Sequence, residues 1–77
     1  MKGDKVEVVV DTGGGTTRTY EVVATRAGRR VDVSVQRGVV WVSELTRSGT
    51  VVRTARFMQS RVLALVEHPV DEGRDVA

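Results

Sequence analysis

Apolar and polar residues alternate along the centre of the chain, from residue 31 to residue 57. Residues 31–36 have a valine at every second position, and this period of two is typical of a strand with one apolar face. Two runs rich in β-branched and aromatic residues follow, at 39–47 and 50–57, and a short break containing glycine precedes each. Glycine in such a break is a hairpin signal. The pattern predicts three antiparallel strands joined by two tight turns.

The length of these two turns decides which side chains share a face. With two-residue turns, Val40 and Val42 lie on the inner face and Trp41 on the outer face. With three-residue turns the faces exchange, because a one-residue shift in register moves every side chain to the other side. A two-residue turn needs a positive φ at its first position, which Arg37 and Ser48 disfavour, whereas a three-residue loop ends on glycine. We therefore favour three-residue turns, with Trp41 in the core.

The residue pattern in the first third of the chain predicts two further strands. Residues 5–11 and 18–25 alternate in the same way, and a glycine-rich loop joins them. A four-residue loop at 26–29 would then form another hairpin and place Ala24 opposite Val31. In this register one apolar face runs through the first three strands.

The segment 58–67 is compatible with two structures. Residues 62–66 form an apolar run of strand length, but the apolar residues of the whole segment also fit one face of a helix. Pro69 biases the residue before it towards extended geometry, and we favour a turn followed by a strand. Residues 69–77 are polar, acidic and without a pattern, as in a disordered tail.

We predict an all-β fold, an antiparallel meander of five or six strands that forms a small barrel or rolled sheet. The alternative is a β-meander with a short helix at 58–67. Residues 1–68 would form a single small β domain and residues 69–77 a disordered acidic tail. A chain of 77 residues has a thin core, so we expect a stability of only a few kcal/mol.

The charge is distributed unevenly along the chain. Residues 1–66 hold eleven basic and six acidic residues, a net charge of +5, whereas residues 67–77 carry a net charge of −3. Ten of the twelve basic residues are arginine, which fits a GC-rich coding sequence as well as a polyanion-binding surface. A charge of +5 is modest beside that of most nucleic-acid-binding domains.

The residue types that support catalysis are scarce. The chain has no cysteine, and its single histidine, His68, precedes the predicted tail. The glycines at 13–15 are followed by a strand and lack the lysine of a phosphate-binding loop. We predict no catalytic residue, no metal site and no cofactor. The sequence also has no apolar run long enough for a membrane span or a signal peptide, so we expect a cytoplasmic, non-membrane protein.

Binding is the class of function that this sequence leaves. We predict a small non-enzymatic regulatory or adaptor module that contacts another protein or a second copy of itself. The candidate interface comprises the outward valines of the favoured register, together with the tryptophan that the other register exposes. These residues are Val40, Val42, Val52 and Trp41. The alternative is nucleic-acid binding through arginines in loops and at strand ends, and these are Arg26, Arg29, Arg30, Arg37, Arg47 and Arg56.

Overall fold

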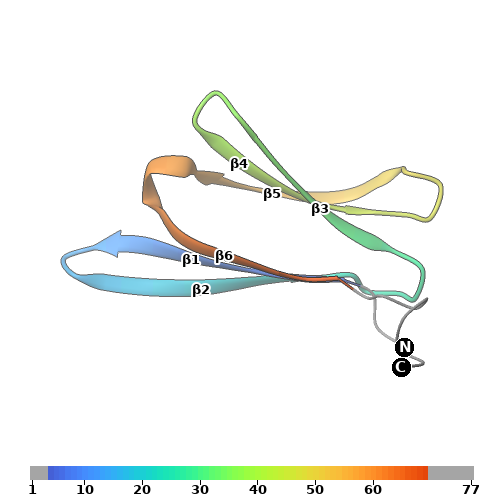
Figure 1. Ribbon diagram of the computed structural model, residues 1–77, viewed down its shortest axis with the longest axis horizontal. Helices are drawn as coiled ribbons and strands as arrows, with labels where there is room; N and C mark the ends of the chain where they lie inside the picture. Colours follow the sequence, from blue (N-terminus) through green and yellow to red (C-terminus); the bar gives the residue numbers. More distant parts are fainter. Residues whose placement is uncertain (1–3, 70–77) are drawn as a thin grey trace.

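Six β-strands make up most of the computed structural model, which describes residues 4–69 (Figure 1). The strands are β1 (Lys5–Gly13), β2 (Thr16–Val23), β3 (Arg30–Gln36), β4 (Val39–Leu45), β5 (Val51–Met58) and β6 (Val62–His68). A single 3-10 turn, η1 (Gln59–Arg61), separates β5 from β6. The all-β prediction is confirmed, and residues 58–67 form the favoured turn and strand. The predicted acidic tail lies, from residue 70 onwards, outside the described residues.

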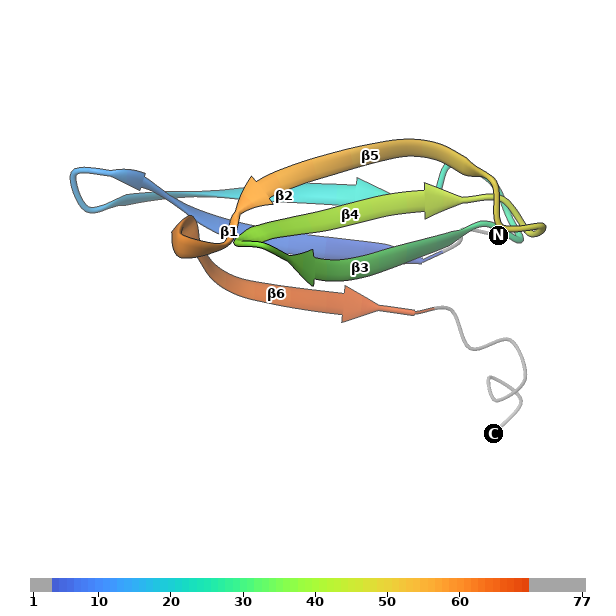
Figure 2. The ribbon, with the colours of Figure 1, turned by 90° about the horizontal axis from the view of Figure 1, so that it is seen from above.

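The strands form two antiparallel sheets of three strands each, ordered β2-β1-β6 and β3-β4-β5. Strands β2 and β5 lie along one side of this sandwich, and β3 and β6 lie along the other (Figure 2). Arg53 of β5 bridges the first side, because its Nη2 donates to the Val23 carbonyl of β2 at 2.7 Å. Within residues 4–69, no strand pairs with the outer edge of either sheet, so the fold is an open sandwich and not a closed barrel.

The hairpin predicted between the second and third strands is wrong. Strands β2 and β3 belong to different sheets. Beyond the end of β2, the Ala24 N–H still donates to the Asp4 carbonyl at 2.9 Å, while the next residue, Thr25, donates to Glu44 of β4. The chain therefore crosses from one layer to the other here, and Ala24 and Val31 share the core without pairing as strand neighbours.

The core lies between the two sheets and is built from small and β-branched side chains. The buried apolar residues are Val6, Val8, Val22, Ala24, Val31, Val40 and Val42. Burying one valine side chain contributes about 1.5 to 3 kcal/mol. Because this core holds so few side chains, a charged group buried beside it has a large effect on the stability of the whole domain.

The turn between β3 and β4 has two residues, which overturns the favoured register. Gln36 pairs with Val39, so Arg37 and Gly38 alone make the turn. Arg37 has a φ of 52° and Gly38 a φ of 77°. Positive φ at both positions is the requirement of a type I′ turn, whose twist matches that of the flanking strands. The match in twist offsets the cost of placing an arginine in the left-handed region.

This turn places Val40 and Val42 on the inner face, where their exposed fractions are 3% and 0%. The prediction that these two valines form an outward strip is therefore wrong. Trp41 lies on the opposite face, across from Ser34 on β3 and Arg56 on β5, as in the two-residue alternative. It is not a core residue.

The second hairpin has the predicted three-residue loop, but a bulge cancels its effect on the register. The Thr46 N–H donates to the Thr50 carbonyl at 2.8 Å and closes a loop over residues 47–49. The pairing then shifts by one residue past Glu44, which leaves Val52 without a partner on β4. This β-bulge returns β5 to the phase that a two-residue turn would give.

The strained turn gives a first prediction. Replacing Arg37 with asparagine, which tolerates a positive φ, should raise the free energy of unfolding by about 0.5 to 1 kcal/mol. Urea denaturation followed by circular dichroism measures the change. Gln36→Asn, at a strand position with ordinary φ, is the matched control and should not stabilise. An Arg37→Asn variant that is less stable than the parent would contradict the type I′ assignment.

Candidate functional site

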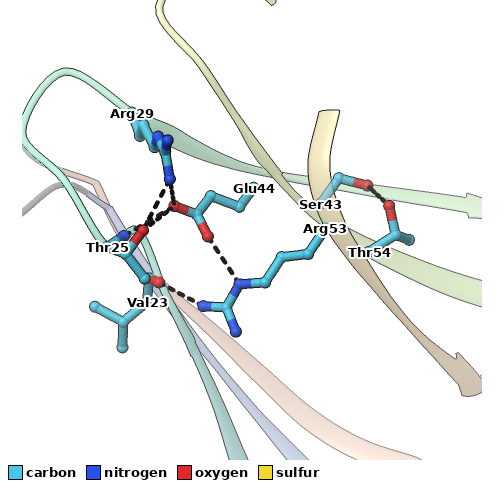
Figure 3. A network of polar contacts seen from close by, with 7 residues as sticks. All are labelled: Val23, Thr25, Arg29, Ser43, Glu44, Arg53 and Thr54. Atoms are coloured by element: carbon cyan, nitrogen blue, oxygen red, sulfur yellow. Dashed lines mark hydrogen bonds and ion pairs between the residues drawn. The ribbon is translucent and has the colours of Figure 1, made fainter. Parts of the chain in front are cut away.

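Glu44 is the one charged residue buried in the described part of the chain, and it forms the centre of a polar cluster (Figure 3). Its Oε2 accepts hydrogen bonds from the Thr25 N–H at 2.8 Å, the Thr25 hydroxyl at 2.9 Å and Arg29 Nη1 at 3.1 Å. Its Oε1 accepts from Arg53 Nε at 2.8 Å. The carboxylate thus joins the loop between β2 and β3 to strands β4 and β5.

These contacts hold Glu44 in its ionised form. The pKa of the Glu44 carboxyl is lowered from 4.5 to about 2, and the hydrogen bond from the Thr25 backbone N–H is the largest cause. Arg53, the Thr25 hydroxyl and Arg29 act in the same direction, while burial opposes them. A carboxylate with this pKa, and with both oxygens engaged, has no proton to give at neutral pH. Its role is to clamp the two sheets together.

The outer face of the sheet β3-β4-β5 carries three rows of side chains, which we call the Trp41 face. Each row takes one residue from each strand, and the rows are Gln36–Val39–Met58, Ser34–Trp41–Arg56 and Asp32–Ser43–Thr54. In the last row, the Ser43 and Thr54 hydroxyls lie 3.1 Å apart (Figure 3). The residues that alternate with these rows on β4 point into the core.

Trp41 lies at the centre of this face. The Arg56 guanidinium carbon is 4.8 Å from the centroid of the indole ring, a cation–π contact. The indole Nε1 is hidden from solvent and has no hydrogen-bond partner among the described residues. A buried polar hydrogen without an acceptor carries an energetic cost, and an acceptor from outside reaches it only when a neighbouring side chain moves aside.

An open groove of about 550 Å³ adjoins the Trp41 face at the end near the β3–β4 turn. It is lined by Arg37, Gly38, Val39, Met58, Gln59 and Ser60. Met58, whose exposed fraction is 63%, and Val39 belong both to the groove and to the Trp41 face. Among the described residues that line the groove and the two rows nearest to it, only Arg37 and Arg56 are charged, so this part of the surface combines apolar side chains with positive charge.

The predicted interface residues do not come together as one surface. Val40 and Val42 are in the core. Val52 is exposed at the bulge of β5, and Trp41 is half-buried on the outer face. The sequence reasoning missed Val39 and Met58, because the three-residue register placed position 39 inward. The signal that could have found them is the Val39–Val42 run, which is apolar on both faces of the strand.

Four of the six predicted polyanion-binding arginines lie at one end of the sandwich. Arg26 and Arg29 precede β3 and Arg30 is its first residue, while Arg47 lies in the β4–β5 loop. The Arg47 guanidinium packs so closely on Gly28 that a Cβ there would lie 2.7 Å from Nη2, so the two loops are in contact. The two remaining arginines, Arg37 and Arg56, belong to the groove and the Trp41 face.

The single histidine of the chain lies beside a carboxylate. His68 Nε2 lies 2.7 Å from Glu7 Oε1 on the surface of the other sheet. Within residues 4–69, no three side chains of the types that bind metal ions are grouped closely enough to hold one. The part of the chain that the structure describes also contains no helix of the length and apolar character needed to span a membrane.

A family model described as "Domain of unknown function (DUF8836)" matches residues 6–69. The chain belongs to this family. The match begins within β1 and ends directly after β6, so the DUF8836 domain is the sandwich itself. Comparison with curated proteins gave no match, and comparison with solved structures gave none either.

Proposed function

We propose that this DUF8836 domain is a non-enzymatic protein-binding module, and that a partner docks on the Trp41 face and the adjoining groove. The single observation that supports this best is the Arg56–Trp41 stack beside exposed Met58. Tryptophan and arginine are the residue types that most often dominate the binding energy of protein interfaces. Here they lie side by side on a regular sheet, which holds them in place without further ordering.

The charges of the surface define the partner. Arg56 and Arg37 flank an apolar strip that contains Val39 and Met58. A complementary segment carries an aspartate or glutamate for the guanidinium groups and, beside it, a bulky apolar side chain for the groove.

Selection of peptides from a random-sequence phage library tests this proposal without a known partner. We expect the selected peptides to share an acidic residue next to a bulky apolar residue. Arg56→Ala and Met58→Ala should each weaken their binding about tenfold or more, because each change removes an anchor side chain. Isothermal titration calorimetry of synthetic peptides measures the dissociation constants.

Arg26→Ala is the matched control, since it removes an exposed arginine from a loop far from the groove. It should leave the affinity for the peptides unchanged. Selection without a consensus, or peptides that bind the Arg56→Ala variant as tightly as the parent, would rule out the Trp41 face as the docking site.

Polyanion binding at the arginine end is the second candidate, and the contact between Arg47 and Gly28 favours it, because that contact gathers arginines from two loops. Fluorescence polarisation of a labelled oligonucleotide over a range of salt concentrations tests it. If this candidate is right, affinity falls steeply with salt, and Arg47→Ala reduces the slope by about one ion. If the domain does not bind the oligonucleotide, or binds it with an affinity that salt does not change, polyanion binding at the arginine end is excluded.

A further inference from the structure

Strand β6 ends beside the arginine end of the sandwich. Its last residue, His68, pairs with Lys5 at the start of β1. Pro69, the final residue that the structure describes, lines a small pocket of about 40 Å³ together with Val31 of β3. Figure 2 shows the same arrangement, because β6 runs towards the end where β4 finishes and β3 begins. The chain therefore leaves the fold close to Arg30, the residue before Val31.

Three exposed arginines at this end have no acidic partner among residues 4–69. Arg26 lies in the loop between β2 and β3, Arg30 is the first residue of β3, and Arg47 lies in the β4–β5 loop. The ion pairs of the described chain all involve other basic residues. This end of the sandwich therefore carries positive charge for which the fold itself supplies no ion-pair partner.

The backbone that carries these arginines is held in place. At the start of the loop between β2 and β3, the Thr25 N–H donates to Glu44 at 2.8 Å. At its end, the Arg29 N–H donates to the Arg26 carbonyl at 3.3 Å. The packing of Arg47 on this loop joins it to the β4–β5 loop. An anion that binds here therefore has little backbone to order, which favours binding.

The residues that follow Pro69 carry charge of the opposite sign. Residues 70–77, which we call the acidic segment, contain three acidic residues and one basic residue, a net charge of −2. The acidic residues are Asp71, Glu72 and Asp75, and the basic residue is Arg74. Opposite charges on two surfaces favour their association. The acidic segment is therefore complementary in charge to the surface beside which it begins.

The acidic segment is also long enough to cover this end. A residue spans at most about 3.6 Å, so Asp71 and Glu72 lie within about 11 Å of Pro69, and all eight residues span at most about 29 Å. The fold measures 27 Å and 17 Å along its two shorter axes. Attachment through a few residues gives an effective concentration on the order of 1 mM. At that concentration even the weak attraction between exposed charges favours this segment over a separate polyanion.

We propose that the acidic segment docks on the arginine end of its own chain, with Asp71 and Glu72 nearest to Arg30. The contact is electrostatic and lies at the surface, so it weakens as the salt concentration rises. A polyanion that binds the same arginines has to displace the segment first, whereas the Trp41 face stays free. The inference is independent of both proposed binding functions, because the segment can occupy the arginines whether or not another ligand binds the domain.

A nitroxide spin label at residue 77 tests this contact in the whole chain. The chain has no cysteine of its own, so Ala77→Cys provides a single attachment site. Nitrogen–proton NMR spectra are compared between the paramagnetic and the reduced label. In about 20 mM salt, the label should weaken the amide signals of Arg26, Arg30 and Arg47. These signals should recover in about 0.5 M salt, where the Debye length is only about 4 Å.

The matched control keeps the length of the segment and removes its acidic charge. It combines Asp71→Asn, Glu72→Gln and Asp75→Asn in the same labelled chain. In about 20 mM salt, this variant should keep nearly full intensity at the amides that the label weakens in the parent.

Three results would overturn the proposal. Equal weakening in the parent and the neutral variant, or weakening that salt does not relieve, would mean that attachment alone brings the label close. Weakening centred on Arg37 and Arg56 would place the segment on the groove and the Trp41 face. Full intensity at the arginine end in the parent would show that the segment does not dock there.

Discussion

Replacing Glu44 with alanine should remove most of the stability of the domain at 25 °C. The change leaves Arg29 and Arg53 without their carboxylate and the Thr25 N–H without an acceptor. Breaking a buried ion pair by removing one partner costs about 3 to 5 kcal/mol. We expect the lower end, about 3 kcal/mol, because the Arg53 side chain is 52% exposed and can turn to water. That loss is close to the total stability of a domain this small.

Urea denaturation followed by circular dichroism measures this loss. Glu21→Ala is the matched control, because Glu21 is exposed on β2 and lies opposite Glu7, a like charge. It should be neutral or slightly stabilising. Glu44→Gln should fall between the two, since the amide keeps the shape and part of the hydrogen bonding. If Glu44→Ala unfolds at the same urea concentration as the parent, Glu44 does not clamp the sheets.

The same carboxylate should make the domain sensitive to acid. The pKa of Glu44 is about 2 in the folded protein and near 4.5 when the chain is unfolded. The folded state therefore binds a proton less readily, and the stabilisation is fully present above pH 4.5 and is lost as the pH falls from 4.5 through 2. One pKa unit corresponds to about 1.4 kcal/mol, so we expect a loss of about 2 to 3 kcal/mol after allowance for solvent near the half-exposed Arg53.

Thermal unfolding at a series of pH values, with Glu44→Gln as the reference, isolates this contribution. The remaining carboxyl groups titrate in both proteins, so the difference between the two stability curves belongs to position 44. The difference should shrink below pH 4.5 and approach zero near pH 2. A constant difference across this range would show that the clamp does not depend on the ionised carboxylate.

The sequence predicted the strands well because the valines alternate. The β3 segment has a valine at every second position, and its apolar face is unambiguous. The β4 segment is apolar at four consecutive positions, 39–42, so its pattern does not say which face is buried. The predicted length of the turn before β4 therefore depended on the φ preferences of its residues. That prediction was wrong at Arg37, because the twist of the flanking strands favours a two-residue turn by more than the positive φ of an arginine disfavours it.

Two features of the site depend on contacts between residues distant in the sequence. The bulge at Val52 reverses the phase that the three-residue loop would set, and no local pattern marks it. Thr25 and Glu44 are nineteen residues apart, and their contact exists only because the loop after β2 crosses between the sheets. The sequence predicts the Glu44–Arg53 pair only in the register with two-residue turns, where the two residues lie opposite each other on β4 and β5. The Trp41 face could not be recognised until that register was known.

The most direct test of the account follows the indole N–H resonance of Trp41, the only tryptophan, in a nitrogen–proton NMR titration with a phage-selected acidic peptide. Because the indole lies in the middle of the proposed docking face, the account predicts a large shift of this signal as the peptide binds. The amides of residues 39, 56 and 58 should shift with it. A peptide that moves the amides of the arginine end or of β6 and leaves the indole signal in place would contradict the assignment of the Trp41 face as the binding surface.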